Sequence, residues 1–306
     1  MTDFTRIFRR TTYATISPSN PGNTQTGRTV LIIGASEGVG LDIAKAFCEA
    51  NAKAVIISSR SKAKLDVATA SLKQIVPSCD VSSIVSDAAD IGQIESLWQQ
   101  LAEAGTLIDV LVLNAAASDN INELDPLEVA RFFQANVIAK LHILHRFQNQ
   151  KHGPSARPMV LIDISSAALQ TYPHPRLALG YPSTKAGFSN YLCHLADIVP
   201  EPSMRIISLH PGVVYTSAVE RASGGRGKDL PIWDDPSLAA HMALWLSSPA
   251  AAFLHGRFIW ANWDADELVA RREEILSDHG LLKVGITGVK SFNMPKLMEK
   301  CAEFPG

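Results

Sequence analysis

Short, mostly apolar runs alternate with amphipathic stretches along most of the chain. The apolar runs stand at residues 29–33, 54–57, 84–85, 108–113, 159–164, 204–209 and 258–260. Such runs, rich in β-branched residues, are typical of strands buried on both faces of a parallel sheet. Between them, apolar residues recur at helical spacing in residues 41–50, 62–75, 91–101, 126–147 and 181–198.

The regular alternation of strands and helices decides the expected fold. It predicts an α/β protein with a Rossmann-type, doubly wound parallel sheet of about seven strands and helices on both faces. Residues 1–27 precede the first strand and read as an extended, turn-rich arm on the surface of the domain.

Composition and charge narrow the functions that this fold could serve. Of 306 residues, 46% are hydrophobic, which is enough for a sizeable core. Lys and Arg total 28 against 30 Asp and Glu, so a protein that binds nucleic acid through a basic surface is not expected. No apolar run approaches the ~20 residues of a membrane span. A small molecule is therefore the expected partner.

The cysteines and histidines point away from a metal site. Cys48, Cys79, Cys193 and Cys301 lie far apart, and no HExxH motif is present. We expect reduced thiols, no metal and a cytoplasmic location. Arg6, Arg9 and Arg10 leave a mitochondrial targeting segment as the alternative.

A glycine-rich turn follows the first predicted strand. It reads Gly34-Ala35-Ser36-Glu37-Gly38-Val39-Gly40, directly before a predicted helix. Glycines let the backbone approach a pyrophosphate, and the helix N-terminus offers free N–H groups to its oxygens. The turn therefore predicts a dinucleotide site, with Gly34, Ser36, Gly38 and Gly40 as contacts.

The end of the second predicted strand indicates which dinucleotide is bound. Ser59 and Arg60 stand there, where an NAD-binding site usually has a carboxylate for the ribose hydroxyls. Arg60 can pair with a 2′-phosphate, so we predict a preference for NADP(H) over NAD(H). Glu37 in the glycine turn acts in the opposite direction, because it adds negative charge nearby.

With these features, the chain resembles the short-chain dehydrogenase/reductase family, and fungal members in particular. The motifs that carry the resemblance occur in the family's order: the glycine turn, Asp87, Asn114-Ala115-Ala116, Asn136, Ser165-Ser166, Tyr181-Pro182-Ser183-Thr184-Lys185 and Pro211-Gly212-Val213-Val214-Tyr215-Thr216. The resemblance covers about residues 28–264, which we expect to form the dinucleotide-binding domain with a substrate loop at 215–235. Residues 265–306 are expected to be a C-terminal extension packed on the same domain.

The resemblance implies an oxidoreductase that interconverts a ketone and a secondary alcohol. Tyr181 would be the acid/base, Ser166 would hold the substrate oxygen, and Asn136 would hold a relay water through the backbone of a kinked helix. Tyr181 and Lys185 stand four residues apart and share a helix face. The ammonium of Lys185 is expected to lower the pKa of the tyrosine toward the working range.

The resemblance also implies the rest of the cofactor site. Lys185 would contact the nicotinamide ribose, Asp87 the adenine, and Thr216 the carboxamide. The complete set expected to contact the cofactor is Gly34, Ser36, Gly38, Gly40, Ser59, Arg60, Asp87, Asn114, Tyr181, Lys185, Pro211, Gly212, Val214 and Thr216.

Several alternatives stay open from the sequence. Ser165 could replace Ser166 as the active serine, and residues 222–228 could be a lid or a plain connector. The aromatic residues Tyr172, Tyr215 and Trp233 could line a substrate pocket or fill the core. The function could instead be a non-redox cyclisation or rearrangement around bound NADP(H), or cofactor sensing by a regulatory protein.

We also expect a homodimer or homotetramer. The family generally forms one, and two predicted helices carry more apolar residues than one face against the sheet needs. The residues concerned are Phe132, Phe133, Leu192 and Leu195.

Overall fold

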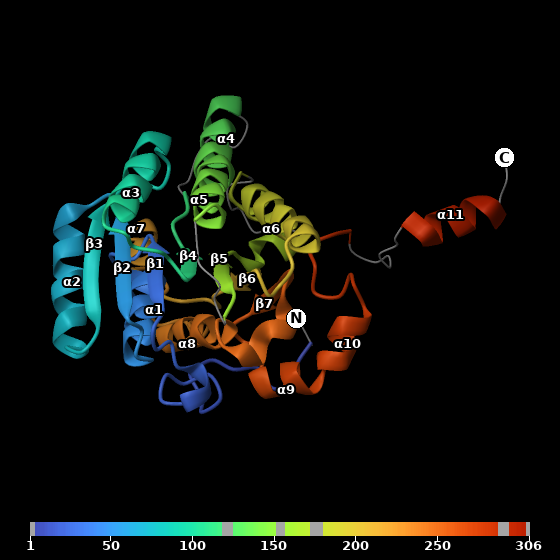
Figure 1. Cartoon of the computed structure of the whole chain (residues 1–306), viewed down its shortest axis with the longest axis horizontal. Helices are drawn as coiled ribbons and strands as arrows, with labels where there is room; N and C mark the ends of the chain where they lie inside the picture. Colours follow the sequence, from blue (N-terminus) through green and yellow to red (C-terminus); the bar gives the residue numbers. More distant parts are fainter. Residues whose placement is uncertain (1–3, 118–124, 151–156, 172–179, 287–293, 304–306) are drawn as a thin grey trace.

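A seven-stranded parallel sheet forms the centre of the protein (Figure 1). The computed structural model describes residues 4–117, 125–150, 157–171, 180–286 and 294–303. The strands are β1 (Thr29–Ile33), β2 (Ala54–Ser59), β3 (Asp80–Val85), β4 (Val110–Leu113), β5 (Met159–Ile164), β6 (Met204–His210) and β7 (Arg257–Trp260). Their order is β3-β2-β1-β4-β5-β6-β7, which confirms the predicted doubly wound α/β class.

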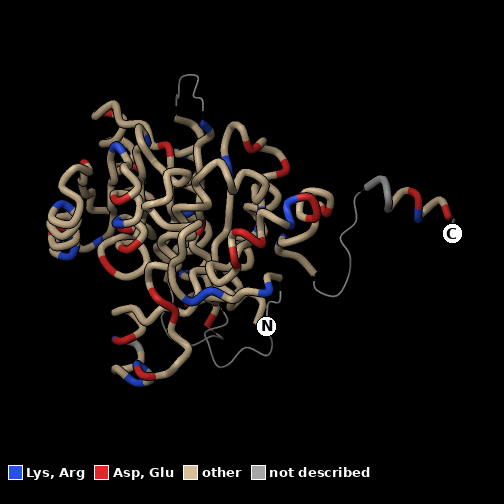
Figure 2. The backbone as a smooth tube through the Cα atoms, turned by 90° about the horizontal axis from the view of Figure 1, so that it is seen from below, with Lys and Arg blue, Asp and Glu red and all other residues tan. Residues whose placement is uncertain are grey.

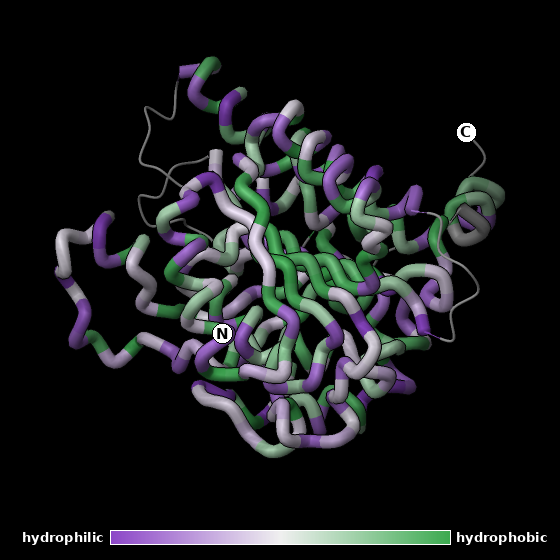
Figure 3. Tube along the Cα trace, turned by 60° about the vertical axis from the view of Figure 1, so that its left-hand side comes forward, coloured by the Kyte–Doolittle hydropathy of each residue, from purple (hydrophilic) through white to green (hydrophobic). Residues whose placement is uncertain are grey.

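Helices cover both faces of the sheet and bury its strands. One face carries α1 (Gly38–Glu49), α2 (Lys62–Ile75) and α8 (Pro236–Leu246), and the other carries α3 (Ile91–Glu103), α5 (Ala139–Gln148) and α6 (Gly180–Ile198). Every residue of β1, β4 and β6 is buried. Figure 3 shows a strongly hydrophobic centre of the fold, where the sheet lies. Because both faces of these strands are buried, their sequences do not alternate between apolar and polar residues.

Two helical regions show how the structure differs from the sequence-based prediction. The helix expected over 126–147 is divided into α4 (Pro126–Phe133), a π-helical turn at Gln134–Ile138, and α5. Helix α8 was not predicted, because eight of its eleven residues are buried and no polar face marks it as amphipathic.

The N-terminal arm packs against the distant end of the chain. Arg9 forms an ion pair with the buried Asp264 at 2.7 Å, and Phe8 forms an antiparallel bridge with Trp263. Arg10 pairs with Asp234 at 3.0 Å. The arm is therefore held by the segments that follow β6 and β7.

The segments beyond β7 continue into further helices. α9 (Ala265–Ala270) and α10 (Arg272–Ser277) pack on the core through Ala265, Leu268 and Ile275. In Figure 1, α11 (Met294–Glu303) lies apart from the body of the domain.

The described surface has mixed charge. Figure 2 shows acidic and basic residues interspersed around the fold. Within the described part of the chain, no helix has both the length and the apolar character needed to cross a membrane.

Candidate active site

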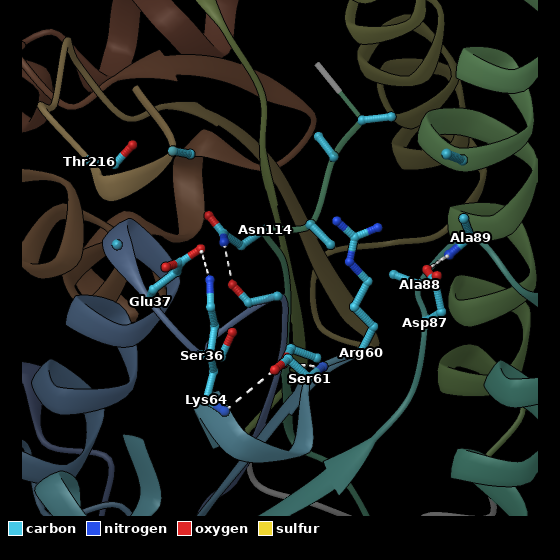
Figure 4. Close-up of a pocket in the computed structure, with 18 of the residues that line it drawn as sticks. Ser36, Glu37, Arg60, Ser61, Lys64, Asp87, Ala88, Ala89, Asn114 and Thr216 are labelled. Atoms are coloured by element: carbon cyan, nitrogen blue, oxygen red, sulfur yellow. Dashed lines mark hydrogen bonds and ion pairs between the residues drawn. The ribbon is translucent and has the colours of Figure 1, made fainter. Parts of the chain in front are cut away.

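A cleft of about 750 Å³ opens at the carboxyl ends of β1, β2 and β4 (Figure 4). The chain crosses from β1 to β2 on one side and later returns to β4 on the other, so this is the topological switch point of the sheet. Ligands bind at such points in open α/β sheets. Of the residues predicted to contact a cofactor, the cleft is lined by Gly34, Ser36, Gly38, Ser59, Arg60, Asp87, Asn114 and Thr216.

The glycine turn is packed too closely for side chains. Gly34 has a φ of +89°, and a Cβ there would lie 2.6 Å from the Ala115 nitrogen. A Cβ on Gly40 would lie 2.3 Å from the Gly34 oxygen, so a side chain at position 40 would collide with the turn. Gly40 itself does not line the cleft. Asn114 Nδ2 donates to the same Gly34 oxygen at 2.6 Å.

The helix that follows the turn presents its N-terminus to the cleft. Glu37 is the N-cap of α1, and its side chain makes no capping hydrogen bond. It instead accepts from Arg221 at 2.7 Å, Lys64 at 2.9 Å and Ser217 at 2.8 Å. The hydrogen bond with Arg221 is the main reason that the pKa of Glu37 falls to about 2. Arg221 and Lys64 thus offset the negative charge of Glu37, the feature of the sequence that spoke against binding of a 2′-phosphate.

The far end of the cleft carries groups suited to an adenosine phosphate. Arg60 extends into it from the end of β2 (Figure 4), beside Ser59 and Ser61. Asp87 lies across the cleft, and its Oδ1 accepts from the Ala89 nitrogen at 3.0 Å. A helix N-terminus without a side-chain cap, a glycine-rich turn and a guanidinium at the far end together fit a dinucleotide with a phosphorylated ribose.

Tyr181, Ser166 and Lys185 come together at the carboxyl end of β5. Tyr181 and Lys185 lie one turn apart on α6, with the lysine Nζ 5.6 Å from the centre of the tyrosine ring. Lys185 is buried, and its Nζ donates to the Ile164 oxygen at 2.6 Å. The Ser166 side chain forms a hydrogen bond with Tyr181, whereas the Ser165 hydroxyl lies 2.8 Å from that of Ser189. Tyr181 and Lys185 lie outside the lining of the cleft itself.

The acidity of Tyr181 differs from the sequence-based expectation. Burial raises its pKa above the ordinary value, and the hydrogen bond with Ser166 and the charge of Lys140 act against this. Burial also lowers the pKa of Lys185, because the interior disfavours its charged form.

A second lysine next to this group escaped the sequence analysis. Lys140 Nζ lies 2.5 Å from Asp163 Oδ1, and both side chains are almost completely buried. The available signal was Asp163, the single charged residue of the apolar strand β5, since Asp is almost never buried unless paired. The distance in sequence between Lys140 and Asp163 hid the pairing.

Asn136 lies in the π-helical turn between α4 and α5 and is buried. Its amide accepts from the Ala117 nitrogen at 2.7 Å and donates to the Ala117 oxygen at 2.9 Å. It also donates to Thr184 Oγ1 at 3.0 Å, which ties the loop after β4 to α6.

The loop after β6 is held by a buried carboxylate. Asp234 Oδ2 accepts from the Val213 nitrogen at 2.8 Å and from Asn262 Nδ2 at 2.9 Å. Gly212 has a φ of +83°, and a Cβ there would lie 2.6 Å from the same oxygen. Pro211, Gly212 and Val214 do not line the cleft, whereas Thr216 does. Asp234 thus fixes the loop from which Thr216 enters the cleft.

Of the other predicted aromatic residues, Tyr215 and Trp233 do not line the cleft. Tyr215 packs edge-on against Trp233, with ring centres 5.0 Å apart. Tyr172 lies outside the described residues. Phe132 and Leu192 are buried within this chain, so these two do not supply the surplus apolar surface that we expected at a subunit interface, whereas Phe133 is 38% exposed.

Comparisons with known proteins agree with this geometry. A sequence model of the family described as short chain dehydrogenase matches residues 28–226. The short chain dehydrogenase/reductase nsrO of Aspergillus novofumigatus is 36% identical over 289 residues, covering 92% of this chain and 96% of that protein. AacuD of Aspergillus aculeatus, with the same description, is 33% identical over 285 residues, with coverage of 92% and 96%.

One solved structure shows the same architecture. The NADP active-site complex of RhlG from Pseudomonas aeruginosa aligns with a TM-score of 0.70 and 22% identity, covering 78% of this chain and 96% of that one. At this identity the likeness concerns the fold.

Proposed function

Because this chain belongs to the short-chain dehydrogenase/reductase family, we propose that it is an NADP(H)-dependent oxidoreductase that interconverts a ketone and a secondary alcohol. The observation that carries the proposal is the meeting of Tyr181, Ser166 and Lys185 beside a cleft shaped for a dinucleotide. Fold alone would not support it, since this fold serves many functions.

The residues of the cleft would hold the cofactor. The N-terminus of α1 and the glycine turn would bind the pyrophosphate, Arg60 the 2′-phosphate and Asp87 the adenine. Lys185 and Thr216 would hold the nicotinamide end. NADPH supplies the hydride in the direction of reduction, and NADP⁺ accepts it in the reverse direction. The NADP complex of the Pseudomonas aeruginosa protein supports this choice of cofactor.

Tyr181 would move the proton. Its raised pKa keeps the phenol protonated at neutral pH, the state that can donate from Oη to a substrate oxygen as negative charge develops there. The Ser166 hydroxyl would donate a hydrogen bond to the same oxygen and polarise it. Between the two serines, the hydrogen bond with Tyr181 supports Ser166 as the active one.

The substitution Tyr181→Phe tests this proposal. It removes one hydroxyl and should lower kcat by about 10²–10⁴-fold with little change in KM, because the proton moves only in the transition state. Lys185→Met should be at least as damaging, since it removes a buried charge beside Tyr181. NADPH oxidation would be followed at 340 nm with a panel of ketones, which include candidate intermediates of specialised metabolism.

A matched control lies on the same helix. Tyr191 is 44% exposed, so Tyr191→Phe should leave kcat and KM unchanged. Near-wild-type kcat in Tyr181→Phe would refute the proposed mechanism. Binding of NADPH without reduction of any ketone would favour a non-redox reaction or cofactor sensing instead.

We propose further that the enzyme works as a homodimer or homotetramer in the cytoplasm. The family resemblance supports the oligomer, although the buried Phe132 and Leu192 do not. If sedimentation at micromolar concentration showed only a species of the monomer mass, 33.1 kDa, that result would contradict the proposed oligomer. Cell fractionation tests the location.

A further inference from the structure

A buried ion pair lies near Tyr181, the proposed acid/base. Lys140 comes from α5 and Asp163 from β5, and their side chains are 4% and 0% exposed. Lys140 Nζ lies 5.1 Å from the ring centre of Phe188, on the same helix as Tyr181 and Lys185. The pair is therefore enclosed between the sheet and α6, away from solvent.

Four ionisable groups face one another in this enclosure. They are Lys140 from α5, Asp163 from β5, and Tyr181 and Lys185 from α6, and each lysine interacts with the single carboxylate. Asp163 Oδ1 is bound by Lys140, whereas Asp163 Oδ2 is buried without a hydrogen-bond partner. The cluster thus contains two lysines for one carboxylate.

The balance of these charges determines what Tyr181 experiences. If Asp163 were paired with Lys185 alone, the two charges would cancel and little positive charge would remain near the phenol. With Lys140 present, the cluster keeps one net positive charge when Tyr181 is protonated. That charge favours loss of the phenolic proton, because interactions are poorly screened inside a protein.

We propose that Lys140 is a positioning residue for proton transfer: it neutralises Asp163, so that the charge of Lys185 remains available to Tyr181. The inference rests on the proposed function, in which Tyr181 is the acid/base. It gives the Lys140–Asp163 pair a role in the reaction although neither side chain would touch the substrate.

The acidities in the cluster agree with this role. Burial lowers the pKa of Lys140 to about 8, and the attraction of Asp163 acts in the opposite direction. The charge of Lys140 also acts on Tyr181 and lowers its pKa, against the effect of burial.

The test measures the ionisation of the residue at position 181 directly. Tyr181 would be replaced by 3,5-difluorotyrosine, a more acidic phenol, and its ¹⁹F chemical shift followed against pH in the full-length protein. Adding Lys140→Met should raise the titration midpoint by about one pH unit or more. Lys140→Arg keeps the charge and should leave the midpoint unchanged. If the pair were purely structural, neither Lys140→Met nor Lys140→Arg would change the titration midpoint.

A double variant protects the test against misfolding. Removing one partner of a buried pair is strongly destabilising, whereas Lys140→Met/Asp163→Asn removes both charges of the pair together. Its midpoint should return toward the parent value, because Lys185 then faces Tyr181 without Asp163. A midpoint in Lys140→Met equal to the parent, or one in the double variant well above it, would overturn the inference.

The same variants separate this inference from the proposed function. If the ¹⁹F midpoints shift as expected but no ketone is reduced, the charge balance stands and the proposed reaction is wrong. If ketones are reduced through Tyr181 while Lys140→Met leaves the midpoint unchanged, the reaction stands and the role of Lys140 is wrong. In an active enzyme, the pH profile of kcat/KM should shift with the midpoint.

Discussion

Gly40→Ala should damage both stability and cofactor binding, and the structure supplies a control that isolates the reason. Gly40 lies in α1 and Gly187 in α6, and neither has a positive φ. An alanine at either position gains up to about 1 kcal/mol of helix propensity. The two substitutions therefore differ in what the new methyl group meets.

The surroundings of the two glycines are opposite. A Cβ on Gly40 would lie 2.3 Å from the Gly34 oxygen and 2.6 Å from Asn114 Nδ2, so the glycine turn must move. A Cβ on Gly187 would have nothing within 4 Å. Overpacking typically costs about 1–3 kcal/mol, so Gly40→Ala should lose up to about 2 kcal/mol net while Gly187→Ala gains up to about 1.

Two measurements check this prediction. Guanidinium denaturation gives the free energy of unfolding of each variant, and NADPH fluorescence gives the Kd. Because Gly34 and Asn114 both line the cleft, Gly40→Ala should weaken NADPH binding at least tenfold, or about 1.4 kcal/mol. The reasoning is wrong if Gly40→Ala is as stable as Gly187→Ala and binds NADPH with the wild-type Kd.

Three further substitutions test other parts of the site. Arg60→Asp should weaken NADPH binding about ten- to hundredfold, since a charge-assisted contact contributes roughly 1.5–3 kcal/mol. Equal affinities of the wild-type protein for NADPH and NADH would contradict the role of Arg60. Asp234→Asn should lower the free energy of unfolding by about 1.5–3 kcal/mol, because Arg10 and Val213 lose a charged acceptor. Asp229 is exposed, so Asp229→Asn should leave the free energy of unfolding unchanged in the same denaturation assay. Burial lowers the pKa of His210 from 6.5 to about 4, so unfolding should take up a proton between these values. His210 should therefore contribute about 3 kcal/mol to the fall in stability from pH 6.5 toward pH 4. Denaturation curves of His210→Asn should show a fall that is smaller by about this amount, because His241 still titrates in the same range.

The sheet could be predicted from the sequence because burial on both faces leaves a clear mark. The runs at 29–33 and 159–164 match β1 and β5 at both ends. α8 could not be predicted in the same way, because a helix that is buried all round has no polar face and no period.

The parts of the candidate site formed by residues close in sequence could be predicted. The parts formed by residues that only the folded structure brings together could not. The glycine turn, Arg60 and the Tyr181–Lys185 spacing are local, so their positions in the cleft or on α6 could be expected. Lys140 and Asp163 are 23 residues apart on elements of different type, and only the packing of α5 on β5 brings them together. The raised pKa of Tyr181 has the same origin, since burial is a property of the folded chain.

The attachment of the N-terminal arm has a consequence for synthesis on the ribosome. Arg9 bonds to Asp264, which is 255 residues further along the chain, and Arg10 bonds to Asp234. At a typical translation rate of about 5–20 residues per second, the arm would wait roughly 13–50 s for Asp264 to be made. Arg10 waits for a similar time, because Asp234 follows it by 224 residues. In a nascent chain, the buried carboxylate that fixes the loop carrying Thr216 should therefore gain its ion pair with the arm long after the arm itself has been made.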